Sequence, residues 1–212
     1  GFDLDENVCF LKVENPKYGT LDCDRSKWEV VFCNSDEKNA VSEPNGDKGG
    51  VGCLFDDDIN SYWHANWSGG TNNDDQFPQL FQGGREMPIT IVVDMKESLI
   101  VHSIGWTQRQ NSDYQDTKKV EYYVSDDEQF KLGGKEDYSP VALNNWTFVM
   151  ERSYQKGYNA TQWQTQSEEV LQKKVKGHLL KVKIVEGYRD RLASGAELYV
   201  KQLLAIDGEP IK

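Results

Sequence analysis

The residues best suited to chemistry lie within fourteen consecutive positions, from Leu54 to Trp67. The first half of this stretch holds three adjacent carboxylates, Asp56–Asp58, followed by the hydroxyl of Ser61. Adjacent carboxylates repel one another unless water solvates them or a cation neutralises them. Hard cations such as calcium take carboxylate, hydroxyl and carbonyl oxygens from irregular loops. The pattern therefore indicates either a cation site or a solvated acidic loop.

The second half of the stretch carries a different chemistry, because Trp63, His64 and Trp67 are aromatic. Aromatic faces and a neutral hydrogen-bonding ring suit a polar ligand that has one apolar face. A structural interpretation stays open for both tryptophans. Trp63 fits a core position, and Trp67 fits a cap on the segment that follows it.

Composition narrows the class of protein. Hydrophobic residues make up 37% and aromatic residues 11% of the 212 residues, which is typical of a folded domain. The formal net charge of −11 disfavours nucleic acid and anionic membranes as partners. No run of about 20 apolar residues is present, so we expect no membrane insertion. The four cysteines form no CxxC pair, and their pairing stays open.

Strand-like segments dominate the chain, and helical periodicity is almost absent. Alternating or β-branched segments separated by turn residues predict strands at 7–13, 27–33, 88–95, 99–107, 119–125, 145–150, 180–184 and 198–206. Residues 34–52 and 68–86 are rich in Gly, Asn and Asp and predict loops. Residues 161–175 fit either a short helix or a loop that leads to a strand. The pattern predicts an all-β protein, a β-sandwich.

The order of several motifs resembles a discoidin domain, also called a coagulation-factor type C domain, and most closely a family 32 carbohydrate-binding module. The resemblance runs from about Asp24 to Gly208. It is carried by the Trp28 strand, 56–64, 88–95, Arg109, 124–127 and 196–198. It implies a jelly-roll β-sandwich of about eight strands that binds ligands in loops at one end. We therefore expect residues 1–22 to be a strand or linker from an upstream module, and residues 23–212 to be the domain.

The resemblance also implies a structural calcium ion in the aspartate loop. The expected ligands are two aspartates, a hydroxyl, a distant glutamate and two backbone carbonyls: Asp56, Asp58, Ser61, Glu197, Cys53 and Ala196. Asp57 stands where the family has a glycine, so easy access to positive φ is lost. Ser61 replaces a threonine and keeps the oxygen. The alternative is a solvated acidic loop without an ion.

The resemblance places a sugar site beside this loop. His64 and Arg109 stand at family ligand positions, Trp67 matches an aromatic partner, and Asn111 follows two residues after Arg109. A sugar offers vicinal hydroxyls to the polar groups and C–H faces to an aromatic ring. Pairing of Arg109 with an aspartate is the structural alternative. We interpret His102 and His178, which lie in strand patterns, as structural.

Catalysis is not expected. Glycosidases use two facing carboxylates, whereas the acids here cluster in one loop, and no nucleophile-elbow, nucleotide-binding or zinc-protease motif occurs. We expect a non-catalytic module that recognises terminal galactose- or N-acetylhexosamine-type sugars. Its expected location is extracellular, at the cell surface or in the periplasm, with tethering to other modules of a larger protein. The alternatives are a protein-adhesion domain and an accessory module of a glycoside hydrolase.

Overall fold

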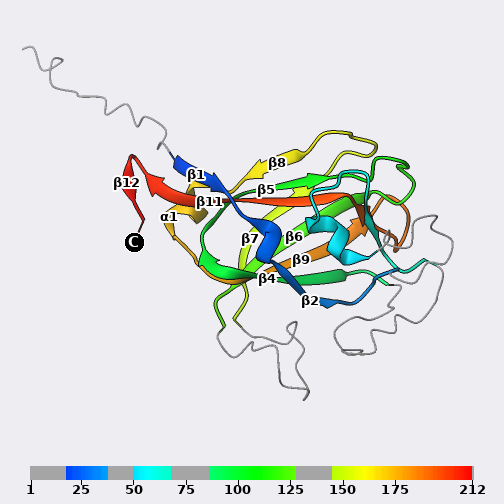
Figure 1. Cartoon of the computed structure of the whole chain (residues 1–212), viewed down its shortest axis with the longest axis horizontal. Coiled ribbons are helices and arrows are strands. Elements are labelled where there is room, and N and C mark those ends of the chain that lie inside the picture. The colour runs from blue at the N-terminus through cyan, green and yellow to red at the C-terminus, as the bar shows by residue number, and fades with distance from the viewer. Residues whose placement is uncertain (1–17, 38–49, 68–85, 128–144, 212) are drawn as a thin grey trace, which may run out of the picture.

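The computed structural model describes residues 18–37, 50–67, 86–127 and 145–211, which form a sandwich of two antiparallel β-sheets (Figure 1). The first sheet has the strand order β1–β11–β5–β8, and β12 pairs with β11. Its strands are β1 (Tyr18–Asp22), β5 (Val101–Thr107), β8 (Gln162–Thr165), β11 (Glu197–Ile206) and β12 (Glu209–Pro210). β1 runs antiparallel to β11, so residues 18–22 form part of this sheet.

The second sheet has the order β2–β4–β9–β6–β7. Its strands are β2 (Glu29–Cys33), β4 (Ile89–Leu99), β6 (Thr117–Ser125), β7 (Thr147–Ser153) and β9 (Gly177–Gly187). A separate two-stranded pair joins β3 (Trp63–His64) to β10 (Ser194–Gly195). This short pair brings the aromatic half of the aspartate stretch next to the segment that leads into β11.

Most of the predicted strands are confirmed. The predictions at 27–33, 88–95, 99–107, 119–125, 145–150, 180–184 and 198–206 correspond to β2, β4, β5, β6, β7, β9 and β11. The ambiguous segment 161–175 contains both a strand, β8, and a short helix, α1 (Glu168–Gln172). Two 3-10 helices, η2 (Arg25–Lys27) and η3 (Val51–Phe55), precede β2 and the aspartates. The predicted strand at 7–13, and the predicted loops except at their ends, lie outside the described residues.

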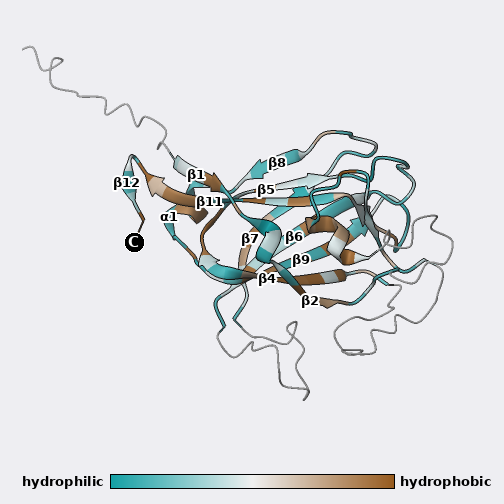
Figure 2. Cartoon of the chain, viewed as in Figure 1, coloured by the Kyte–Doolittle hydropathy of each residue, from teal (hydrophilic) through white to brown (hydrophobic). Residues whose placement is uncertain are grey.

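The core lies between the sheets because alternate residues of each strand face inward. In β6, Val120, Tyr122 and Val124 are buried, and the hydroxyl of Tyr122 lies 2.7 Å from that of Tyr154. Trp63 and Trp106 are both fully buried in the same cluster, so Trp63 is a core residue. Figure 2 shows hydrophobic stretches on β4 and β11 and mostly hydrophilic connecting segments. No helix within the described residues is long and apolar enough to cross a membrane.

Gly195 tests how tightly the β3–β10 pair is packed on the core. A Cβ atom at Gly195 would overlap the Trp106 ring, whereas one at Gly52 would meet nothing within 4 Å. We expect Gly195→Ala to lower the free energy of unfolding by roughly 1–3 kcal/mol, because a well-packed core resists added volume. Urea denaturation of Gly195→Ala and the control Gly52→Ala measures this. Equal stabilities of the two variants would contradict the packing described here.

Candidate functional site

The aspartate loop is a compact turn held by its own side chains. Asp57 adopts φ 61°, the left-handed conformation expected of the glycine that it replaces. The Asp58 N–H donates to Asp56 Oδ1 at 2.9 Å, and the Ser61 N–H donates to the Asp58 carbonyl at 2.8 Å. The Ser61 hydroxyl donates to Asp56 Oδ2 at 2.7 Å. The turn is therefore formed with Asp56 and Ser61 side by side.

Arg25, which the sequence analysis did not single out, projects from η2 into this region. Asp24 caps η2 by accepting from the Ser26 N–H at 3.0 Å, and Arg25 itself is buried. Its Nη1 donates to Glu197 Oε2 at 2.5 Å and to the carbonyls of Leu54 and Leu198 at 3.1 and 2.9 Å. Its Nη2 donates to Asp57. One guanidinium thus connects η2, η3, the aspartate turn and β11.

Glu197 is the buried acid of this cluster and is fully inaccessible to solvent. Burial raises the pKa of the Glu197 carboxyl to about 7, and the charges of Asp56 and Asp57 act in the same direction. The Arg25 guanidinium opposes this rise through its hydrogen bond and its charge. Oε1 of Glu197 is buried and has no hydrogen-bond partner among the described residues. Oε1 of Glu197 is therefore available to accept a hydrogen bond or to bind a cation.

The structure assembles only part of the expected calcium-ligand set. Asp56, Ser61 and the Cys53 carbonyl lie together, since the Ser61 hydroxyl is 3.5 Å from that carbonyl, and Asp56 acts electrostatically on Glu197. Asp58 differs, because its Oδ1 accepts from the backbone and side-chain nitrogens of Asn60 at 2.9 and 3.1 Å.

The surroundings of Glu197 further define the expected calcium-ligand set. Within the described residues, no three His, Cys, Asp or Glu side chains gather as a metal site. The Ala196 N–H donates to the Thr107 carbonyl at 2.8 Å, which fixes the backbone beside Glu197. The oxygens that converge are therefore two carboxylates, a hydroxyl and a carbonyl, while a guanidinium holds one carboxylate oxygen.

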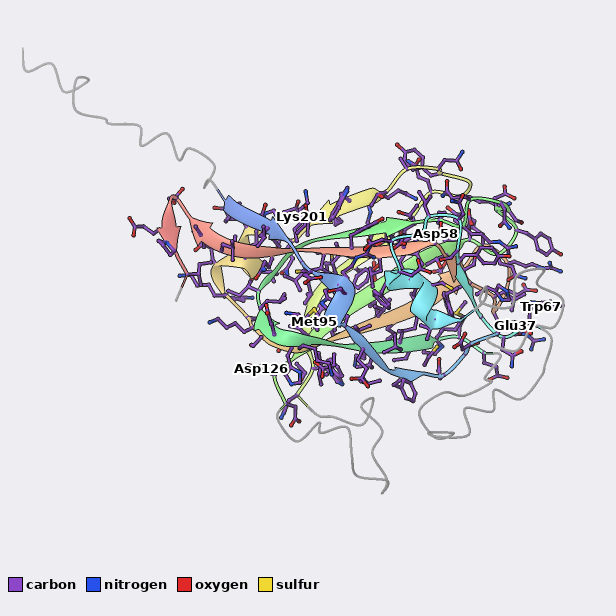
Figure 3. All side chains as sticks on the ribbon, viewed as in Figure 1. Glu37, Asp58, Trp67, Met95, Asp126 and Lys201 are labelled. Atoms are coloured by element: carbon purple, nitrogen blue, oxygen red, sulfur yellow. The ribbon has the colours of Figure 1, made fainter. Side chains whose placement is uncertain are left out.

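A pocket of about 600 Å³ lies near β3, between three connecting segments. Its wall comes from the segment after β3, from the β5–β6 connection and from the turn between β9 and β10: Trp67, Arg109, Ser112, Tyr114, Gln115, Arg189, Asp190, Arg191 and Leu192. Trp67 is 36% exposed, and its backbone N–H donates to Glu37 Oε2 at 2.8 Å. Figure 3 shows Trp67 and Glu37 together at one end of the sandwich. The volume falls within the range of small-ligand pockets.

Two of the four expected ligand residues, Trp67 and Arg109, share this wall. Arg109 stacks with its Cζ 3.8 Å from the centre of the Tyr62 ring, and its Nη2 donates to the Tyr62 hydroxyl at 3.0 Å. Its Nε donates to Asn111, which is exposed and is not on the wall. Asn111 therefore orients Arg109, and Arg109 forms no ion pair with a described aspartate.

His64 is not among the residues that line this pocket, and its expected contact with a ligand stays a prediction. Its ring is fully buried, between Tyr62 at 5.8 Å and Trp67 at 6.5 Å, measured between ring centres. Its Nδ1 lies 3.3 Å from the Ala65 carbonyl. The other two histidines have strand contacts: Nδ1 of His102 is 2.6 Å from the Ser103 hydroxyl, and Nδ1 of His178 is 3.2 Å from Asp94.

The part of the wall that follows β9, residues 189–192, was not predicted from the sequence. Tyr114 is 53% exposed, and Arg189 stacks on it with Cζ 3.5 Å from the ring centre. Arg191 lies two residues further on, in a turn closed by the Leu192 N–H donating to the Arg189 carbonyl at 2.9 Å. The signal in the sequence was a pair of arginines around an aspartate, between a strand and a glycine, in an otherwise acidic chain.

Buried polar residues fix the segments that carry the wall. Gln108 is fully buried, and its Nε2 donates to the Thr117 carbonyl at 2.7 Å, across the base of the β5–β6 connection. The Ser194 hydroxyl donates to the Gln115 carbonyl at 3.0 Å, and the Thr117 hydroxyl donates to the Ser194 carbonyl at 2.8 Å. Segments far apart in the sequence are thereby held in one arrangement.

No protein-family model and no curated protein sequence matches the chain. Solved structures do match it. The C-terminal domain of a chitobiase from Bacteroides fragilis aligns over 87% of this chain and 100% of its own length, with a TM-score of 0.61 and 18% identity. A family 32 carbohydrate-binding module from Clostridium perfringens, in complex with GalNAc-β-1,3-galactose, aligns over 85% and 99%, with a TM-score of 0.59 and 17% identity.

The family 32 module of NanJ from Clostridium perfringens, in complex with galactose, aligns over 86% of this chain and 99% of its own, with a TM-score of 0.56 and 18% identity. Similarity at these identities establishes the fold. The chain has the discoidin-like β-sandwich fold of family 32 carbohydrate-binding modules, which confirms the fold predicted from the sequence.

Removing Arg25 should destabilise the domain strongly. Arg25→Met leaves the buried Glu197 without its cation, and breaking one side of such a pair lowers the free energy of unfolding by about 3–5 kcal/mol. The double variant Arg25→Met/Glu197→Met should lose less, because no unpaired charge stays buried. Denaturant titration in metal-free buffer measures both. As a control, Lys118→Met breaks an exposed pair with Glu186 and should change stability little, because water screens such a pair. An equal, small effect of Arg25→Met and Lys118→Met would contradict the assignment.

Proposed function

We propose that this chain is a non-catalytic carbohydrate-binding domain whose glycan site is the pocket between Trp67 and Arg109. The observation that carries the proposal is that these two residues, selected as ligand positions from the sequence, line one open pocket in the structure. Trp67 supplies an exposed aromatic face, and Arg109 supplies the donors of Nη1, which has no acceptor among the described residues. An aromatic face with a few convergent polar groups is what a sugar requires.

We propose terminal galactose- or N-acetylhexosamine-type sugars as the ligand class. Two of the structurally similar modules are described as complexes with galactose and with GalNAc-β-1,3-galactose, at identities of 18% and 17%. The pocket here has the polar composition for such a ligand, with Ser112 and Gln115 beside the arginines. A shallow site of this kind gives weak binding, with dissociation constants near the millimolar range, roughly −4 kcal/mol.

A binding role fits the chemistry of the wall better than hydrolysis does. Glycoside hydrolysis uses a pair of carboxyl groups that flank the bond. Among the described residues that line the pocket, Asp190 is the one carboxylate. A binder of terminal glycans works where glycans are displayed, so we propose an extracellular, cell-surface or periplasmic location.

We also propose that one calcium ion binds beside the aspartate turn. Asp56, Ser61 and the Cys53 carbonyl already lie together. The buried Oε1 of Glu197, which has no hydrogen-bond partner among the described residues, could bind a cation there. The Ala196 carbonyl completes the proposed set. We leave the Asp58 carboxylate out, because it caps Asn60. The ion would add positive charge to a cluster in which Arg25 alone faces three acids, Asp56, Asp57 and Glu197.

The glycan site is tested by a glycan array with wild type, Arg109→Ala and Trp67→Ala. Hydrogen bonds to a charged group contribute about 1.5–3 kcal/mol, so Arg109→Ala should weaken binding roughly tenfold or more. Trp67→Ala should remove stacking. The control is Trp163→Ala, which removes a tryptophan of similar exposure, 39%, on β8. Absence of glycan binding by wild type, or equal binding by wild type and Arg109→Ala, would overturn the site.

The calcium proposal is tested by melting temperature with and without chelator. An ion that binds only the folded state stabilises by RT ln(1 + [L]/Kd), on the order of a few kcal/mol at saturating concentration. Chelator should lower the melting temperature of wild type but not of Asp56→Asn. The exposed acid Asp22 provides the control, since Asp22→Asn should keep the response. Unchanged melting of wild type, together with no ion retained after dialysis, would exclude the site.

A further inference from the structure

The pocket wall concentrates positive charge in a protein that is otherwise strongly acidic. Five arginines lie in the described residues, and three of them, Arg109, Arg189 and Arg191, line this pocket. With Asp190 as the one acid of the wall, its formal charge is 3 − 1 = +2, against −11 for the whole chain. The three guanidinium charges repel one another because they share a small region, and a bound anion would reduce this repulsion.

These three guanidiniums have no ion-pair partner among the described residues, although Arg109 acts electrostatically on the buried Asp116. The other two arginines have partners: Arg25 pairs with Glu197, and Arg152 donates to Gln164 at 2.7 Å. None of the three pocket arginines forms an ion pair with a described carboxylate. A solvated surface arginine also lacks such a pair, but it is not usually joined by two others around one pocket.

Aromatic rings orient two of the three guanidiniums. Arg109 lies over Tyr62 and Arg189 over Tyr114, at 3.8 and 3.5 Å from Cζ to the ring centre. Stacking occupies the face of a guanidinium and leaves its in-plane N–H donors available. The side chain of Arg189 donates no hydrogen bond to a described residue, and Nη1 of Arg109 is likewise without a described acceptor. The oriented donor fork of Arg189, which has no described acceptor, is suited to bidentate recognition of a planar or tetrahedral oxyanion.

We infer that the sugar bound in this pocket carries an anionic group, a carboxylate or a sulfate, which Arg189 and Arg191 recognise while Trp67 and Arg109 hold the ring. The inference rests on the proposed function, since it specifies the ligand of the same site. Asp190 lies between the two arginines in the sequence. It is exposed, and it forms no ion pair with either of them in the described structure. It disfavours a second anion next to the first and leaves the site selective for one negative group.

The test is calorimetric titration at low salt with four probes: galactose, galacturonate, galactose 6-sulfate and inorganic sulfate. An ionised acceptor makes a hydrogen bond roughly twice as strong as a neutral one, so one of the two acidic sugars should bind about tenfold tighter than galactose. The preferred acidic sugar tells carboxylate from sulfate. Added salt should reduce this preference, because it rests on charge.

Variants assign the preference to the two arginines. Arg189→Gln/Arg191→Gln should lose the preference, so that acidic and neutral sugars bind with similar affinity. The control is Lys118→Gln, which removes one exposed positive charge in β6, outside the wall, and should leave the preference intact.

Three results would overturn the inference, and they separate it from the proposed function. Galactose binding as tight as that of both acidic sugars rejects the anionic ligand but leaves a glycan-binding domain. Binding of no sugar at all rejects both proposals. Inorganic sulfate binding as tightly as the acidic sugars also rejects both, because the pocket would then be a plain anion site.

Discussion

The buried pairing of Arg25 with Glu197 is the constraint on which the rest of the domain depends. Arg25 comes from the short turn before β2, and Glu197 begins β11, so one ion pair joins segments 172 residues apart in the sequence. Burying two charges is favourable only where further hydrogen bonds satisfy them. Here the carbonyls of Leu54 and Leu198 accept further hydrogen bonds from the Arg25 guanidinium. The aspartate turn is drawn to the same point through Asp57.

That anchoring explains why the pocket forms where it does. The aspartate turn leads directly into β3, and β3 pairs with β10, two residues before Glu197. Trp67 and the turn that carries Arg189 and Arg191 are therefore placed by the same short pair of strands. Gln108 holds the third segment, the β5–β6 connection, by donating to the Thr117 carbonyl. The pocket residues are thus surface side chains on segments that buried hydrogen bonds hold to the end of the sandwich.

Strands such as β6 and β9 were predictable because their inward and outward residues alternate with period two, and β4 because of its β-branched run. The pocket residues Trp67 and Arg109 were selected from the order of motifs in the sequence, and the structure places both on one wall. Arg25 was not predicted, because its role depends on a contact with a residue far along the chain, which no local pattern encodes. The expected roles of Asp58 and His64 stay predictions, because the motif gives their positions but not the turn bonds and burial that direct their side chains.

The central claim is that a sugar binds at the Trp67 end of the sandwich. The indole N–H resonances of the tryptophans, followed in two-dimensional nitrogen–proton spectra during a galactose titration, test it most directly. Trp67 and Trp163 are exposed to similar extents, 36% and 39%, so each serves as a reference for the other. We predict a saturable shift of the Trp67 resonance with no comparable shift at Trp163. A saturable shift at Trp163 alone, or no shift at either tryptophan with galactose or with an acidic galactose derivative, would contradict the account.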